Sequence, residues 1–149
     1  MSNSAAPPER RLSLLLLLVA AHQRMAQLVD RELASDGVAA DGYAVLSLIG
    51  VRGPVRLTEL AVELGMPLTT ASDIVRRLEA RRRVRRRPNP EDGRSSLFEL
   101  TASGDREWRR GWGALQRVNS ALARNLDMKE SHASLMRLND AFADALTDD

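Results

Sequence analysis

The chain of 149 residues contains no cysteine, which excludes disulfide bonds, cysteine-ligated zinc sites and thiol-based redox sensing. Histidine occurs only at His22 and His132, so a histidine-based metal site would need carboxylate ligands as well. Aromatic residues make up only 3% of the chain, whereas apolar residues make up 44%. The core is therefore expected to be aliphatic, mostly Leu, Val and Ala, and Leu and Ala favour helix over strand.

Motifs of catalysis are also missing from the sequence. There is no nucleophile paired with a base, no metal-ligand spacing and no glycine-rich loop that would cradle a phosphate. The sequence therefore predicts a protein that is not an enzyme and that uses no cofactor or metal.

The positive charge is concentrated in one segment. The net charge is only +2, yet residues 76–94 hold nine arginines against three acidic residues, which gives this segment +6 and leaves −4 for the rest. A basic block on an otherwise acidic chain is typical of a protein that binds a polyanion.

The N-terminal segment allows two interpretations. Arg10 and Arg11 precede an apolar run from Leu14 to Ala21, as in a signal peptide. However, apolar residues continue beyond the run at helical spacing, and the run is too short to span a bilayer. These residues are Met25, Leu28, Val29 and Leu33. We therefore expect a structural helix in a cytoplasmic protein without a membrane partner.

Hydrophobic periodicity and turn residues predict a mainly α-helical fold with a small β-hairpin. The third helix is expected to start after Thr58 as its N-cap and to close at Gly65. Pro, Asn and Asp-Gly between the two strands are turn residues. The predicted helices span 11–34, 40–51, 59–64, 68–81, 102–125 and 128–147, and the predicted strands span 84–88 and 96–100.

The run Leu14–Val19 is apolar all round, so it must be covered on more than one side. One small chain supplies one side, and a second copy is the natural source of the other. The last two predicted helices carry further apolar stripes that lack an obvious partner. These stripes comprise Trp108, Trp112, Leu115, Val118 and Leu122, then Leu135, Leu138, Phe142 and Leu146.

The predicted helix 68–81 turns its apolar residues inward and leaves polar side chains on its other faces. Hydroxyl groups at the start of such a helix can bond phosphates or base edges, and arginines further along reach phosphates. The alternative is an ordinary solvated helix face. The candidate DNA-binding residues on this helix are Thr69, Thr70, Ser72, Asp73, Arg76 and Arg77.

The hairpin favours DNA over the solvated alternative. Its arginines, among them Arg86, cannot all be buried, and like charges repel each other. At the tip, Arg94 can enter a narrow A·T-rich minor groove, and Asp92 is close enough in sequence to orient it. We therefore add Arg86, Asp92 and Arg94 to the candidate DNA-binding residues.

The pattern Asp92-x-Arg94 followed by Leu100-Thr101-x-x-Gly104 resembles the step from wing to helix in the MarR family of bacterial transcriptional regulators. Leu60-Ala61-x-x-Leu64-Gly65 is a weaker match, shared with many helix-turn-helix proteins. The resemblance covers about residues 12–147. It implies one protomer over 1–149, with a winged helix-turn-helix lobe over 38–101 and a helical dimerisation region over 11–37 and 102–147.

The resemblance also implies a function. It implies a homodimer that binds a near-palindromic operator in double-stranded DNA, associated with the bacterial nucleoid through that operator. It further implies a repressor relieved by a small aromatic or phenolic ligand. The family's ligand pocket lies where the first two helices meet the DNA-binding lobe, so the candidate ligand residues are His22, Met25, Tyr43 and Leu46. The alternative is core packing for Met25 and Leu46 and a satisfied interface histidine for His22.

Several positions depart from the family pattern. The family often has Arg where Asp73 stands and Asp where Arg76 stands, and Asp73 is spaced to pair with Arg77 one turn later. Pro67 replaces a capping Ser or Thr. Arg82-Arg83 replaces a common Gly-Leu, which predicts backbone strain and a lost apolar contact.

A different class of function is a winged helix that dimerises and binds a protein partner without specific DNA binding. The arginine-rich hairpin argues against it, because protein interface cores are depleted in charge. The sequence thus favours a dimeric, sequence-specific DNA-binding transcriptional regulator.

Overall fold

We describe residues 13–147 in a computed structural model of the chain. The fold is mainly helical with one small sheet, as predicted. Three antiparallel strands pair in the order β1-β3-β2. The elements are α1 (Leu14–Ser35), α2 (Tyr43–Arg52), β1 (Val55–Arg56), α3 (Leu57–Glu63), α4 (Leu68–Ala80), β2 (Val84–Asn89), β3 (Asp92–Leu100), α5 (Ala102–Ala123) and α6 (Met128–Thr147).

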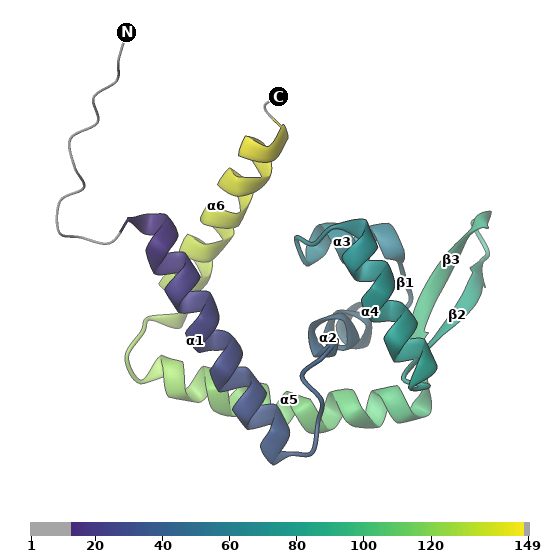
Figure 1. The fold of residues 1–149 in the computed structure, drawn as a ribbon, viewed down its shortest axis with the longest axis horizontal. Helices are drawn as coiled ribbons and strands as arrows, with labels where there is room; N and C mark the ends of the chain where they lie inside the picture. Colours follow the sequence, from purple (N-terminus) through teal and green to yellow (C-terminus); the bar gives the residue numbers. More distant parts are fainter. Residues whose placement is uncertain (1–12, 148–149) are drawn as a thin grey trace, which may run out of the picture.

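The arrangement separates a compact lobe from a pair of protruding helices. Helices α2 to α4 and the sheet gather at one end of α5, whereas α1 and α6 extend from its other half (Figure 1). The core lies mainly in the lobe, where Leu46, Ile49, Leu60 and Leu78 are all but inaccessible to solvent. None of the described helices is long and apolar enough to cross a membrane.

The ends of the helices follow local chemistry in most cases. Thr101 begins α5 as an N-cap, its hydroxyl accepting a hydrogen bond from the Gly104 amide at 3.0 Å. Gly65 follows α3 with a left-handed backbone, φ +60°, as predicted. Pro67 precedes α4 without a side-chain capping bond, also as predicted. The extent of α6 and the start of α5 agree with the sequence-based expectations.

Other boundaries were predicted wrongly. Helix α3 begins two residues early, because Arg56 rather than Thr58 is its N-cap and Glu59 accepts the Arg56 amide proton at 2.7 Å. Helix α2 begins three residues late, after Gly42. Strand β1 was not predicted, since two residues carry no detectable alternation. Residues 10–12, which belong to the signal-peptide interpretation and the predicted first helix, lie outside the described residues.

The protruding helices expose much apolar surface. On α1, each of the first four leucines is at least half exposed. Helix α6 contains no buried residue, and Leu135 and Leu146 are 61% and 84% exposed. On α5 the predicted stripe is buried only in part: Val118 is in the core, but Trp112 is exposed. Soluble chains seldom leave so large an apolar surface without a partner.

Candidate nucleic-acid interface

Helix α4 presents a polar face to solvent, as the sequence predicted. Ala71, Val75 and Leu78 are buried and Ile74 packs against the core, so the polar side chains lie on the outer faces. Thr69, Thr70 and the side chain of Asp73 are exposed, whereas Ser72 is half-buried. The hydroxyl groups therefore lie at the start of an exposed helix face, where a polyanion can approach.

The predicted pairing on this helix is wrong. Asp73 pairs with Arg76, one turn away at 3.0 Å, and not with Arg77. Arg77 instead donates two hydrogen bonds to Asp41 in the loop between α1 and α2, at 3.0 and 3.2 Å. A guanidinium fork matches a carboxylate in this two-bond geometry, which explains why Arg77 pairs with the more distant acid.

Asp41 also holds a second arginine. Arg81, the C-cap of α4, donates to the Asp41 carbonyl oxygen at 2.8 Å and lies 3.5 Å from its carboxylate. Hydrogen bonding from Arg77 is the main cause that lowers the pKa of Asp41, so the carboxylate stays ionised at neutral pH. The sequence analysis missed Asp41, because its partners lie more than thirty residues away and no local spacing connects them.

The hairpin places its arginines on an exposed antiparallel ribbon. Arg85 and Arg87 both pair with Glu99 across the strands, at 2.7 and 3.2 Å. Arg86 points to the other face, where its guanidinium lies 5.2 Å from the centre of the Phe98 ring. Because successive side chains of a strand point to opposite faces, the predicted DNA contact Arg86 lies on the other face from Arg85 and Arg87.

At the tip of the hairpin, the Asp92 carboxylate accepts a hydrogen bond from the Arg94 backbone amide at 3.0 Å. Asp92 therefore shapes the turn, whereas the prediction had it orient the guanidinium. The Arg94 side chain is exposed, and no described acidic residue pairs with it. This leaves the guanidinium at the tip available for an external partner.

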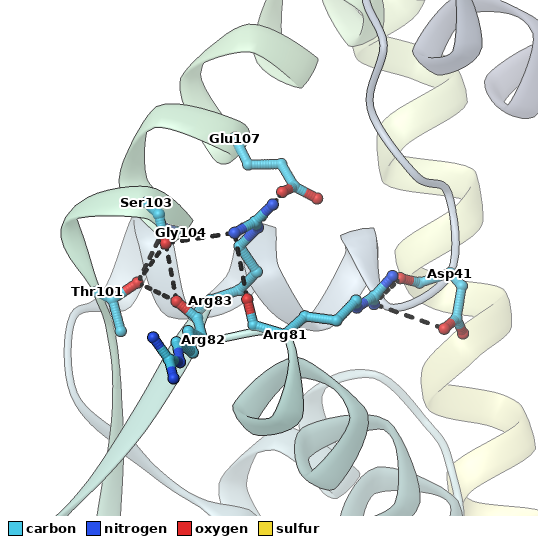
Figure 2. A network of polar contacts seen from close by, with 8 residues as sticks. All are labelled: Asp41, Arg81, Arg82, Arg83, Thr101, Ser103, Gly104 and Glu107. Atoms are coloured by element: carbon cyan, nitrogen blue, oxygen red, sulfur yellow. Dashed lines mark hydrogen bonds and ion pairs between the residues drawn. The ribbon is translucent and has the colours of Figure 1, made fainter.

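A polar network fastens the end of α4 to the start of α5 (Figure 2). Arg82 is the one described non-glycine residue with a positive φ, 56°, which confirms the predicted strain. Its carbonyl oxygen accepts hydrogen bonds from the hydroxyls of Thr101 and Ser103, at 2.7 and 2.8 Å. These bonds help to offset a backbone conformation that costs about 1–2 kcal/mol.

Arg83 forms an ion pair at the position where the sequence predicted the loss of an apolar contact. Its guanidinium pairs with Glu107 of α5, a carboxylate whose side chain is 9% exposed, and also reaches the Arg81 carbonyl at 3.2 Å. The Arg82 side chain points away from this network (Figure 2). The sequence alone did not reveal Glu107, because it looks like one more charged residue on an amphipathic helix.

The structure does not bring the four candidate ligand residues together. Tyr43 and Leu46 are core residues, and the Tyr43 hydroxyl donates to the Trp108 carbonyl at 2.7 Å. Burial raises the pKa of Tyr43, so this hydroxyl stays neutral. His22 and Met25 instead line a separate groove of about 470 Å³ between α1, α5 and α6, whose other walls include Leu18, Leu28, Val118, Leu122 and Leu135.

Comparison with known proteins connects this geometry to one group of regulators. Residues 40–95 match the sequence profile of the MarR family, a range that covers the lobe and most of the hairpin. The chain is also similar to an HTH-type transcriptional regulator, YxaD, of Bacillus subtilis, with 32% identity over 82 residues. That match covers 55% of this chain and 57% of YxaD, so it spans only a little over half of the relative.

Solved structures resemble a larger part of the chain. A probable transcriptional regulator from Pseudomonas aeruginosa is 26% identical, with a TM-score of 0.70 over 87% of this chain and 96% of that one. The PcaV transcriptional regulator from Streptomyces coelicolor, solved with its natural ligand, is 25% identical, with a TM-score of 0.75 over 95% and 99%. A mutant MarR from E. coli, complexed with operator DNA, is 25% identical, with a TM-score of 0.73 over 86% and 92%.

Proposed function

We propose that the chain is a transcriptional regulator of the MarR family, and not an enzyme, that binds double-stranded operator DNA as a homodimer. The observation that carries this proposal is the exposed polar face of α4 next to an arginine-lined hairpin. A helix with this face fits a major groove, and the hairpin arginines reach phosphates and the minor groove beside it.

We assign the DNA contacts to two surfaces. On α4, Thr69, Thr70 and Ser72 would bond base edges or phosphates, and Arg76 and Arg77 would neutralise phosphates. Both arginines are paired with acids in the structure, and these pairs reduce the positive charge that Arg76 and Arg77 present to phosphates. On the hairpin, the contacts are Arg86 and the tip formed by Asp92 and Arg94.

Dimerisation would use α1, the second half of α5, and α6. These helices expose leucines and other apolar side chains that the described part of the chain leaves uncovered. This division makes 38–101 the DNA-binding lobe and 11–37 with 102–147 the dimerisation region of a single protomer. Two-fold symmetry of the protein would require a near-palindromic operator, with half-site centres about 10 base pairs or a multiple apart.

We further propose that the protein is a cytoplasmic repressor that a small aromatic or phenolic ligand releases from its nucleoid-bound operator. The groove between α1, α5 and α6 supports a ligand of this class, because its walls are apolar and include the polar groups of His22 and Arg24. PcaV, a structurally similar regulator, was solved with its natural ligand, which supports ligand control of this chain.

The decisive test is to map the sites bound by the full-length protein across the source genome and to footprint the strongest of them. We expect a near-palindrome, bound by two chains, with an affinity that falls steeply as salt rises. Sedimentation should find a dimer at low micromolar concentration, without a folded monomer. A short asymmetric site bound by one chain would contradict the proposal, and salt-independent binding to a protein partner would favour an interaction module instead.

A further inference from the structure

A cavity of about 450 Å³ lies beside the start of α5, away from the groove that contains His22. Its walls come from the first turns of α5 and from Arg83, the residue directly before β2. They consist of Arg83, Ser103, Arg106, Arg109 and Arg110. Helical spacing explains the cluster, because residues 103, 106 and 110 fall on one face of α5, the face that Arg83 approaches.

The cluster carries more positive than negative charge. Glu107 neutralises Arg83, and Asp105 pairs with Arg109 at 2.8 Å. Arg106 and Arg110 are exposed, and neither pairs with an acidic residue in the part of the chain that the structure describes. Four guanidinium groups thus face two carboxylates, which leaves a charge of about +2 for a ligand to neutralise.

One hydrogen-bond donor in this cavity, Arg83 Nη1, is held loosely. Arg83 Nη1 donates to the Arg81 carbonyl at 3.2 Å and to the Ser103 hydroxyl at 3.4 Å, both near the long limit for such bonds. A carboxylate or phosphate oxygen would offer the same donor a shorter, charge-assisted bond. An anion can therefore approach this nitrogen without displacing a short contact, while Arg83 Nε keeps its bond to Glu107.

The position of the cavity favours a small molecule over DNA. The lining residues lie on the first turns of α5 and at Arg83, and none of them belongs to the exposed face of α4 or to the hairpin tip. The Arg83 side chain turns from the end of α4 toward α5 and Glu107 (Figure 2). A recess of this volume also has the size of a small-ligand site.

From these observations we propose that the cavity binds a small dianion, whose charge is carried by phosphate oxygens or by two carboxylates. Arg106 and Arg110 supply the unpaired positive charge, and Arg83 and Ser103 supply further donors. The same Arg83 and Ser103 hold the carbonyl groups of Arg81 and Arg82 at the end of α4. A dianion bound to Arg83 and Ser103 therefore also affects the residues at the end of α4. A resulting change in DNA affinity rests on the proposed function.

The test is calorimetric titration of the full-length protein with inorganic phosphate and, separately, with succinate, at constant ionic strength. We compare the wild type with the double variant Arg106→Gln/Arg110→Gln. The control is Arg124→Gln, which removes one exposed arginine near the end of α5, outside the cavity. Circular dichroism melting confirms that each variant folds, which we expect because these side chains are exposed.

We expect saturable binding of one dianion per chain, weakened at least about tenfold in the double variant and unchanged in Arg124→Gln. The arm that binds more tightly, phosphate or succinate, identifies the ligand class. No saturable binding of either probe, or equal losses in the double variant and the control, would overturn the proposal. Anisotropy with a random duplex is measured in parallel without dianion. If the double variant loses duplex affinity and the wild type binds neither probe, the cluster is a DNA surface instead.

Discussion

The pairing of Arg77 with Asp41 yields a prediction about DNA affinity. In Asp41→Asn, the carboxylate that accepts two hydrogen bonds from Arg77 becomes a neutral amide. Arg81 keeps its bond to the Asp41 backbone carbonyl, since the substitution leaves that group in place. The structure therefore predicts that one arginine of α4, and not two, becomes free to contact a phosphate.

The magnitude follows from counterion release. One additional phosphate contact makes the salt slope, log K against log salt concentration, steeper by about 0.9. The variant should bind more tightly than the wild type at 50 mM salt. Between 50 and 200 mM salt its affinity should fall by a further factor of about 3.5 relative to the wild type. This gain should appear on random duplexes as well as on the operator, because phosphate contacts carry no base information.

The cost to folding should be small. Both partners are half exposed, so water screens the ion pair and its contribution to folding is small. We expect the melting temperature to fall by about 1–2 °C. The pKa of Asp41 is lowered in the folded state, so the stabilisation is complete above its ordinary pKa of 3.8 and is lost as the pH falls further. Wild type and variant should thus differ at neutral pH and converge in acid below that value.

The assay is fluorescence anisotropy with a labelled duplex at four salt concentrations between 50 and 200 mM. Asp30→Asn is the matched control, because it removes the same charge from an exposed position on α1. An identical slope in wild type and Asp41→Asn would refute the reasoning, since it would mean that Arg77 gains no phosphate contact. An equal change in Asp30→Asn would attribute the effect to net charge alone.

Three further predictions test other parts of the structure. Arg94→Ala should weaken operator binding, mostly at A·T-rich flanks, with unchanged melting; unaltered affinity in a gel-shift titration would contradict its role at the hairpin tip. Asp73→Ala should free Arg76 and strengthen binding to operator and random DNA alike, whereas a loss of about 1–3 kcal/mol confined to the operator would show that Asp73 reads a base. Gly111→Ala should destabilise the fold by about 2 kcal/mol in urea unfolding, because its Cβ would collide with a buried tyrosine ring. On the same helix, the Cβ of Gly113→Ala would make only ordinary van der Waals contacts, so this variant should stabilise the protein slightly; equal effects at both glycines would refute the packing argument.

The sequence by itself determined those features that depend on neighbouring residues. The apolar residues of α4 recur at intervals of three and four, so that burying one face fixes both the helix and its exposed side. Thr101 and Gly65 mark helix ends through bonds and dihedral angles that span three or four residues. The strain at Arg82 followed from a non-glycine residue at a helix end, for the same local reason.

The tertiary structure alone decided which charges meet. Asp73 and Arg77 have suitable spacing for a pair, yet Arg77 pairs with Asp41, since folding brings that carboxylate into two-bond geometry. In the same way, Glu107 accepts Arg83 only because the end of α4 packs against α5. Of the four candidate ligand residues, two lie in the core and two line a groove. The packing of the helices, and not the spacing of these residues along the chain, decides which side chains become neighbours. Such contacts join residues that are distant in sequence, and local periodicity carries no information about them.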